Sequence, residues 1–304
     1  MSNNPVLLTT DLPLPVFVKG KVRDSYDLGK YLLFVATDRI SAFDVVLPCG
    51  IPDKGRVLNQ ISAYWFAQTK NIVPNHVIEM VDDVRVLDKY LSADKRFTYP
   101  GYLAGRSMIV KKVKRLQVEC VVRGYLAGSA WAEYQKSGTA FGIPLPKNML
   151  ESQELPEPLF TPTTKADAGH DLPINIEEMG KQIGEVLANT IKEKSLAIYN
   201  FARKQAIVRG IIIADTKFEF GLENDKLIII DEMLTPDSSR FWDAKLYKVG
   251  QSQPSYDKQP VRDWLTKSGW NKEPPTPMLP AEIIASTSRI YRTAYERLTG
   301  KKLA

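Results

Sequence analysis

Histidine and cysteine are scarce in this sequence, which contains only His76, His170, Cys49 and Cys120. No Cys-x-x-Cys motif and no histidine pair at helical spacing occurs, so most zinc sites are excluded and a Ser-His-Asp triad is disfavoured. Two cysteines define no disulfide framework, and a reducing cytoplasm is the expected location. Any chemistry must therefore use carboxylates, lysine, arginine and a bound metal ion.

Long apolar runs are also absent. No segment approaches the roughly 20 apolar residues of a membrane helix. Residues 1–8 lack the basic region and apolar core of a secretory signal. We therefore expect no membrane partner. The sequence also has no Gly-x₄-Gly-Lys-Ser/Thr motif, so a Walker A phosphate loop is excluded.

The charge is positive but dispersed. The formal net charge is +6, which suits either a nucleic acid or a small polyanionic substrate. The densest basic run, 111–115, falls in a predicted strand. A nucleic-acid reader more often shows a clustered basic helix or an exposed aromatic platform. The pattern favours a small anionic substrate and no nucleic-acid partner.

The hydrophobic content of 44% and charged content of 25% are typical of a globular protein. Periodicity predicts strands over 16–19, 31–36, 44–47, 77–81, 107–114 and 117–122. It predicts helices over 56–69, 126–137, 176–209, 260–267 and 280–299. This mixture indicates an α+β fold, with a strand-rich N-terminal lobe (1–118) and a larger C-terminal lobe (119–304).

Proline and acidic residues dominate 144–173, which shows neither helical nor strand periodicity. We interpret the segment as extended. We hypothesise that 151–171 covers a cleft and becomes ordered when substrates bind.

Residues 211–221 and 228–232 are apolar runs rich in β-branched residues, separated by a polar turn. They predict a β-hairpin. Because strand side chains alternate between faces, Asp215, Lys217 and Glu219 share one face.

A three-residue loop at 224–226 would place Glu219 directly opposite Asp231. Two carboxylates and Lys217 would then converge beside a buried sheet, where unpaired charges are costly. Such oxygen ligands suit Mg²⁺, which usually accompanies a nucleotide phosphate. A surface hairpin with salt-bridged charges explains the local pattern about equally well.

Gly20, Lys21 and Arg23 precede the strand 31–36. Glycine allows close approach of a ligand to the backbone, and the two cations alternate onto one strand face, where they could hold nucleotide phosphates. A solvated, charged strand is the simpler explanation of this motif alone. Asp44 ends a polar stretch, 37–44, that could read a ligand's polar edges or form an Asp-capped turn.

Arg123 follows an apolar strand, and Ser129 stands at the expected start of a helix. Arginine and a hydroxyl near a helix N-terminus can form an anion site. A routine strand-to-helix turn is the alternative. Arg240 lies in a polar loop, and Arg262 follows soon after. The two supply forked donors suited to phosphate or carboxylate, and an ordinary charged loop is the alternative.

Taken together, these motifs resemble the SAICAR synthetase (phosphoribosylaminoimidazole-succinocarboxamide synthase) family, in its longer monofunctional fungal type. The resemblance extends from Gly20 to the last helix, and its most specific stretches are 119–129 and 215–221. The stretches 231–242 and 256–259 support it independently. Two departures are Gln117, where proline is usual, and Pro260, where a larger apolar residue is usual. Neither is a catalytic position.

The resemblance implies a two-lobed nucleotide-binding fold, with an antiparallel N-terminal sheet like a kinase small lobe and ATP between the lobes. It implies an ATP-dependent ligase of de novo purine biosynthesis. The enzyme would condense carboxyaminoimidazole ribotide (CAIR) with L-aspartate through an acyl phosphate, giving SAICAR, ADP and phosphate. A monomer is expected rather than an oligomer.

The resemblance also implies residue roles. Lys217, Glu219 and Asp231 would be catalytic, and the two carboxylates would hold Mg²⁺. ATP would be bound by Gly20, Lys21, Arg23, Glu119 and Lys217. Substrate would be bound by Asp44, Arg123, Ser129, Arg240 and Arg262. A small-molecule kinase would share the metal carboxylates but need no amine substrate, and a nucleic-acid-binding protein would be supported only by the positive charge.

Overall fold

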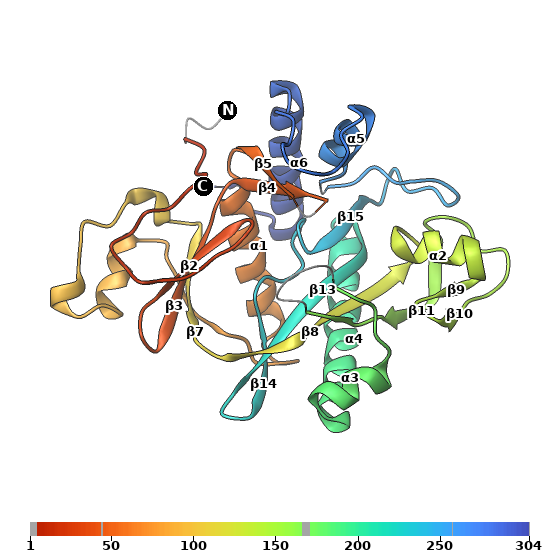
Figure 1. Ribbon diagram of the computed structural model, residues 1–304, viewed down its shortest axis with the longest axis horizontal. Helices are drawn as coiled ribbons and strands as arrows, with labels where there is room; N and C mark the ends of the chain where they lie inside the picture. The colour runs from red at the N-terminus through yellow and green to blue at the C-terminus, as the bar shows by residue number, and fades with distance from the viewer. Residues whose placement is uncertain (1–4, 44, 166–170, 257, 304) are drawn as a thin grey trace. The chain divides into compact units, whose positions relative to one another are not determined.

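The computed structural model describes residues 5–43, 45–165, 171–256 and 258–303 (Figure 1). The chain divides into two compact units, and each is built from separate segments. Unit 1 contains Met1–Phe66, His76–Lys112 and Tyr256–Ala304, and unit 2 contains Ala67–Asn75 and Val113–Ser255. This division differs from a single boundary after residue 118, because the C-terminal segment belongs with the first strands.

Unit 1 contains a five-stranded antiparallel sheet in the order β1-β2-β3-β7-β6. Its strands are β1 (Val16–Lys19), β2 (Arg23–Asp27), β3 (Tyr31–Ala36), β6 (Val77–Met80) and β7 (Ser107–Lys111). Aliphatic side chains such as Leu33, Val35 and Ile109 are fully buried in its core. The antiparallel N-terminal sheet and the mixed α+β class are confirmed.

The helices of unit 1 are α1 (Lys54–Thr69), whose last three residues fall in unit 2, α5 (Gln259–Lys267) and α6 (Ala281–Thr299). Short 3₁₀ helices span Val84–Lys89, Ala93–Lys95 and Gly101–Leu103. A second core joins the ladder of β4 (Arg39–Ala42) and β5 (Val45–Gly50) to the C-terminal helices. Ser288 of α6 donates a hydrogen bond to the Pro52 carbonyl at 2.9 Å. These contacts explain why the last helices belong to unit 1.

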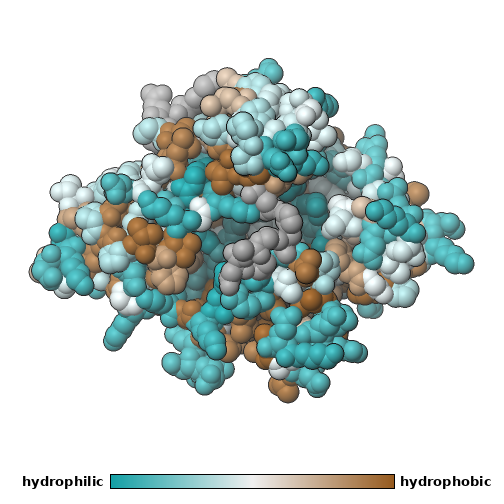
Figure 2. All heavy atoms as spheres, viewed as in Figure 1, coloured by the Kyte–Doolittle hydropathy of each residue, from teal (hydrophilic) through white to brown (hydrophobic). Residues whose placement is uncertain are grey.

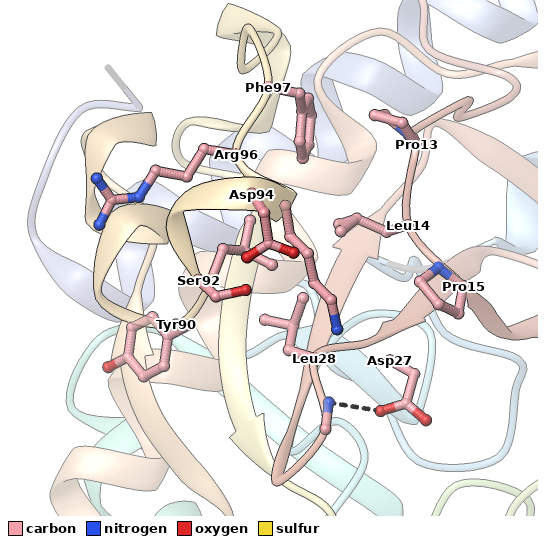
Figure 3. A pocket seen from close by; sticks show the side chains of 13 residues that line it. Pro13, Leu14, Pro15, Asp27, Leu28, Tyr90, Ser92, Asp94, Arg96 and Phe97 are labelled. Atoms are coloured by element: carbon pink, nitrogen blue, oxygen red, sulfur yellow. Dashed lines mark hydrogen bonds between the residues drawn. The ribbon is translucent and has the colours of Figure 1, made fainter.

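A pocket of about 650 Å³ opens in unit 1 beside the turn between β2 and β3 (Figure 3). Leu14, Leu28 and Phe97 point into it, and Asp27 accepts a hydrogen bond from the Gly29 amide at 2.8 Å. None of the described site residues predicted from the sequence lines this pocket.

Unit 2 is built on a six-stranded sheet. Its central path is β11 (Glu154–Phe160), β8 (Lys114–Tyr125), β13 (Ile211–Glu223) and β14 (Lys226–Ile230), with β12 (Thr163–Thr164) beside β8 and β15 (Ser239–Asp243) beside β13. A small ladder joins β9 (Thr139–Ala140) and β10 (Ile143–Pro144). The helices are α2 (Ser129–Ser137), α3 (Ile176–Ile183) and α4 (Glu185–Ile207).

Helix α4 packs along β8 and β13 (Figure 1). It buries Ile191, Ile198 and Ala202 on one side, at the spacing of an amphipathic helix. The single helix expected over 176–209 is wrong, because the chain bends at Gly184, where φ is +94°, and α3 ends there. Asn175 begins α3 with a capping box completed by Glu178.

The segment 144–173 is more regular than its composition suggested. Residues 154–160 and 163–164 pair antiparallel with β8, whereas 166–170 lie outside the described residues. The expected lack of strand structure is therefore wrong for β11 and β12. Pro156 and Pro158 are compatible with β11 because it is the edge strand, where a missing amide leaves no ladder bond unmade.

The predicted hairpin is present, but its turn is shorter than expected. Asn224 and Asp225 both have positive φ and form a two-residue turn, so that Glu223 pairs with Lys226. Glu219 consequently pairs with Ile230, and the predicted pairing of Glu219 with Asp231 is wrong.

Hydrophilic side chains cover most of the face shown in Figure 2, and hydrophobic residues form small separate patches there. Both cysteines are free and buried. Within the described ranges, no helix has the length and apolarity required to cross a membrane.

Gly124 of β8 offers a test of how α4 is fixed to the sheet. A Cβ at this position would lie 1.9 Å from the Tyr199 hydroxyl oxygen, which donates to the Ile213 carbonyl at 2.7 Å. We predict that Gly124→Ala lowers the free energy of unfolding by about 1–3 kcal/mol through overpacking. Chemical denaturation measures this loss.

Gly101→Ala is the matched control, because a Cβ there meets nothing within 4 Å. Adding Tyr199→Phe to Gly124→Ala should recover part of the loss, since the nearest clashing atom is removed. Strictly additive losses in the double variant would contradict the proposed clash.

Candidate active site

One face of the unit 2 sheet carries two charged clusters. The antiparallel register of β8 and β13 places Glu119 opposite Glu219 and Arg123 opposite Asp215. Lys217 lies between the two acidic residues of β13 and contacts the first pair. The predicted common face of Asp215, Lys217 and Glu219 agrees with these contacts.

The first cluster is an acidic pair bridged by two lysines. Lys217 Nζ lies 2.6 Å from Glu119 Oε1 and 3.2 Å from Glu219 Oε1. Lys165 Nζ lies 2.5 Å and 2.8 Å from the same two atoms. Sequence reasoning missed Lys165, and it missed that Glu119 faces Glu219. The spacing of Glu119 and Arg123 could have shown that both side chains lie on one face of their strand, because strand residues four apart share a face.

The cluster is strongly coupled electrostatically. Burial alone raises the pKa of Glu219, but the ammonium groups of Lys217 and Lys165 outweigh burial and hold that pKa at about 2. Burial alone lowers the pKa of Lys217, yet Glu219 and Glu119 raise it above its usual value. Glu219 and Lys217 therefore both carry charge at neutral pH, and close pairing compensates for their desolvation.

The second cluster is cationic. Arg123 Nε donates to Thr161 Oγ1 at 3.0 Å, and Arg123 Nη1 lies 3.3 Å from Asp215 Oδ2. Arg240 pairs with the same Asp215 oxygen. The Phe141 ring covers the Arg123 guanidinium at 4.5 Å. Two guanidinium groups thus share one carboxylate, which leaves a net positive charge suited to an anion.

The start of α2 adjoins this cluster. A Cβ on Gly128 would lie 2.3 Å from Arg240 Nη2, and φ at Gly128 is +57°, so both space and conformation require glycine. Ser129 follows directly as the first residue of α2. The structure therefore places Gly128, the residue before Ser129, against Arg240, which shares Asp215 with Arg123, and a helix N-terminus with arginines favours an anion.

Asp231 lies just beyond β14, in the left-handed region with φ of +69°. Its neighbour Ile230 pairs with Glu219, so Asp231 is one residue past the acidic pair along the adjacent strand. Within the part of the chain that the structure describes, no group of three or more His, Cys, Asp or Glu forms a complete metal site. A Mg²⁺ ion that takes its other ligands from phosphate and water would need fewer protein carboxylates, and Glu219 and Asp231 are the two predicted from the sequence.

Unit 1 carries the other predicted nucleotide residues. Gly20 begins a tight turn between β1 and β2, and its amide donates to the Arg23 carbonyl at 2.8 Å. Lys21 lies within this turn, and the Arg23 guanidinium lies over Phe34 at 4.4 Å. Arg39, which sequence reasoning missed, donates to the carbonyl oxygens of Gly20 and Lys21 at 2.8 and 3.1 Å.

The other two predicted substrate residues are Arg262 and Asp44. Arg262 is a half-buried residue of α5 in unit 1. Asp44 lies outside the described residues.

The Glu219 pKa predicts an acid dependence of stability. Because the folded-state pKa is about 2 and the ordinary value is 4.5, this carboxylate stabilises the folded state above about pH 4.5. The contribution is lost as pH falls toward 2, and it amounts to about 3 kcal/mol. Glu219→Gln should therefore show a flatter loss of unfolding free energy between pH 5 and 2 than the wild type.

Denaturant titrations at several pH values measure the difference. Glu193→Gln, at an exposed position on α4, serves as the control and should follow the wild type. Parallel curves for Glu219→Gln and the wild type would contradict the pairing.

Comparisons with known proteins point to one family. The family model described as SAICAR synthetase matches residues 16–277. A phosphoribosylaminoimidazole-succinocarboxamide synthase of Thermodesulfovibrio yellowstonii is 52% identical over 296 residues, which cover 97% of this chain and 99% of the relative.

Solved structures give the same result. The SAICAR synthase of Saccharomyces cerevisiae complexed with SAICAR has a TM-score of 0.88 and 44% identity, covering 97% of this chain and 99% of that one. A SAICAR synthetase in complex with ADP has a TM-score of 0.66 and 26% identity, covering 94% and 98%.

Proposed function

This chain belongs to the SAICAR synthetase family, and we propose that it uses ATP to join L-aspartate to the carboxylate of CAIR. The products are SAICAR, ADP and phosphate, as in de novo purine biosynthesis. The observation that carries this assignment is the arrangement on β8 and β13, where a lysine-bridged acidic pair and an arginine cluster share one face of the sheet.

The spacing of the clusters suits a ribotide. Glu119 and Arg123 lie four residues apart on β8, which corresponds to about 13 Å at the rise of a strand. We assign the ribotide phosphate to Arg123, Arg240 and the start of α2 at Ser129. The reacting carboxylate then lies toward the acidic pair.

The chemistry requires activation, because a carboxylate is a poor acyl donor. The CAIR carboxylate attacks the γ-phosphorus of ATP and forms an acyl phosphate, and the aspartate amine then displaces phosphate. Phosphoryl transfer depends mainly on positioning and charge neutralisation. Lys217, held by Glu119 and Glu219, is placed to neutralise charge on the transferring group.

The remaining assignments concern the nucleotide and metal. Glu219 and Asp231 would hold Mg²⁺, which neutralises charge on the ATP phosphates when bound. Glu119 would orient Lys217 beside the nucleotide. In unit 1, the turn at Gly20, with Lys21 and Arg23, would clamp the phosphates.

Two substrate assignments rest on the family resemblance rather than on contacts. Arg262 would meet an anionic group of substrate, and Asp44 would face the imidazole or ribose of CAIR. The tight turn that begins at Gly20 supports close approach of a phosphate to the backbone.

We assign the protein to the longer monofunctional type represented by the yeast enzyme. The TM-score of 0.88 with the yeast structure, against 0.66 with the ADP complex, supports this subtype. The relative described above is bacterial, so the proposal concerns the type of enzyme and not a fungal source. We further propose a cytoplasmic monomer; the two free, buried cysteines suit a reducing compartment.

A substrate-omission assay tests the function. We predict that purified protein releases ADP only when CAIR, L-aspartate, ATP and Mg²⁺ are all present, apart from slow leakage. Lys217→Met should lower the rate by at least two orders of magnitude, because charge neutralisation at the transferring group is lost. A coupled ADP assay measures both effects. Equal ADP release without aspartate would support a small-molecule kinase instead.

Asp231→Asn separates a metal role from a structural one. Asparagine tolerates the left-handed backbone found at Asp231, so the melting temperature without ligands should be unchanged or slightly higher. Turnover should fall by orders of magnitude if this carboxylate helps to hold Mg²⁺. A large loss of thermal stability with near-normal activity of the folded fraction would reverse the assignment.

A further inference from the structure

Lys165 has no role in the assignments above, although it makes the shortest contact in the acidic cluster. Its ammonium group lies 2.5 Å from Glu119 Oε1 and 2.8 Å from Glu219 Oε1. The two glutamate side chains are 9% and 7% exposed, whereas Lys165 is 20% exposed. The lysine thus reaches an enclosed acidic pair from a more open position.

The backbone holds Lys165 in place at this cluster. Thr163 pairs with Glu119 across the β12–β8 ladder, and the Lys165 amide donates to the Gln117 carbonyl at 3.0 Å. A short strand on the edge of β8 therefore delivers the ammonium to the acidic pair. Lys217, in contrast, belongs to the central strand β13.

The charge balance depends on both lysines. Two carboxylates directly opposite each other on neighbouring strands repel, and two ammonium groups neutralise them. Removal of Lys165 would leave two carboxylates beside one ammonium, a net charge of −1 that attracts a cation.

The contacts of Lys165 are also those that a metal would need. Lys165 contacts Oε1 of both glutamates, and Glu219 is also one of the two carboxylates assigned above to Mg²⁺, which would approach such an oxygen to about 2.1 Å. Lys217 and Lys165 already contact both oxygens, so a further cation cannot approach them without strong repulsion unless one ammonium leaves. Lysine is a compact point charge on a flexible stem, so it can leave while the backbone stays paired.

We propose that Lys165 is an internal counter-cation for the Glu119–Glu219 pair, occupying the position of a divalent cation until a metal–nucleotide complex displaces it. The inference rests on the proposed function for the nucleotide. The consequence is selectivity for the metal–nucleotide complex over free metal. The site binds a free divalent metal ion weakly, and the phosphates of the nucleotide make the replacement of Lys165 by the metal favourable.

Lys165→Met tests the proposal without turnover. Mn²⁺ serves as the probe, and its binding is measured by electron paramagnetic resonance in the absence of nucleotide. The variant should bind Mn²⁺ about tenfold or more tightly than the wild type, because a competing positive charge is gone. In chelator, the variant should melt at a lower temperature than the wild type, and Mn²⁺ should restore the loss.

Two further variants control the experiment. Lys192→Met removes an exposed lysine of α4 and should leave Mn²⁺ binding unchanged. Glu119→Gln combined with Lys165→Met removes one carboxylate of the pair, and it should abolish the added Mn²⁺ affinity while recovering part of the stability.

The proposal is overturned if folded Lys165→Met binds Mn²⁺ no more tightly than Lys192→Met. It is also overturned if Lys165→Met is unfolded and saturating Mn²⁺ does not refold it, because the metal must be able to replace the ammonium. Failure of the proposed function would show separately, as ADP release that does not require CAIR and aspartate.

Discussion

The register between β8 and β13 determines which charges meet on the functional face. It sets a carboxylate against a carboxylate at Glu119 and Glu219, and an arginine against a carboxylate at Arg123 and Asp215. A shift of one residue would turn one strand's side chains to the opposite face. This pairing concentrates negative charge in one place, and Lys217 and Lys165 neutralise that charge.

The opposite face of the same strands carries the packing that holds the register. Tyr199 of α4 occupies the space beside Gly124 and bonds to Ile213, while α4 buries an aliphatic stripe against the sheet. Charged residues are expensive to bury. The sheet therefore separates its tasks, with apolar contacts on one side and compensated ions on the other.

Much of the fold was accessible from sequence because it depends on local patterns. The strands 16–19 and 31–36, the hairpin, and the shared face of Asp215 and Lys217 follow from alternation and turn residues. The exact length of the turn could not be predicted in this way, because it depends on Asn224 and Asp225 both adopting positive φ. The proline-rich strand β11 was missed because its stability comes from an edge pairing rather than from its own residues.

The candidate site was only partly predictable for a related reason. Motifs identified individual charged residues, but two of the residues around Glu219 come from β8 and from the residue that follows β12. Such long-range partners leave no periodic signal in one sequence. Lys165 lies in a segment whose composition resembles a loop. Its contact with the acidic pair could therefore be found only from the strand pairing in the structure.

Arg39 has a consequence for the direction of the backbone at the β1–β2 turn. Its guanidinium draws in the carbonyl oxygens of Gly20 and Lys21. Because each peptide unit is planar and trans, its N–H points opposite to its carbonyl. The N–H groups of Lys21 and Val22 are therefore directed away from Arg39. By binding two successive carbonyl groups, Arg39 orients two backbone dipoles with their positive ends in the same direction. Successive N–H groups oriented in this way attract anions.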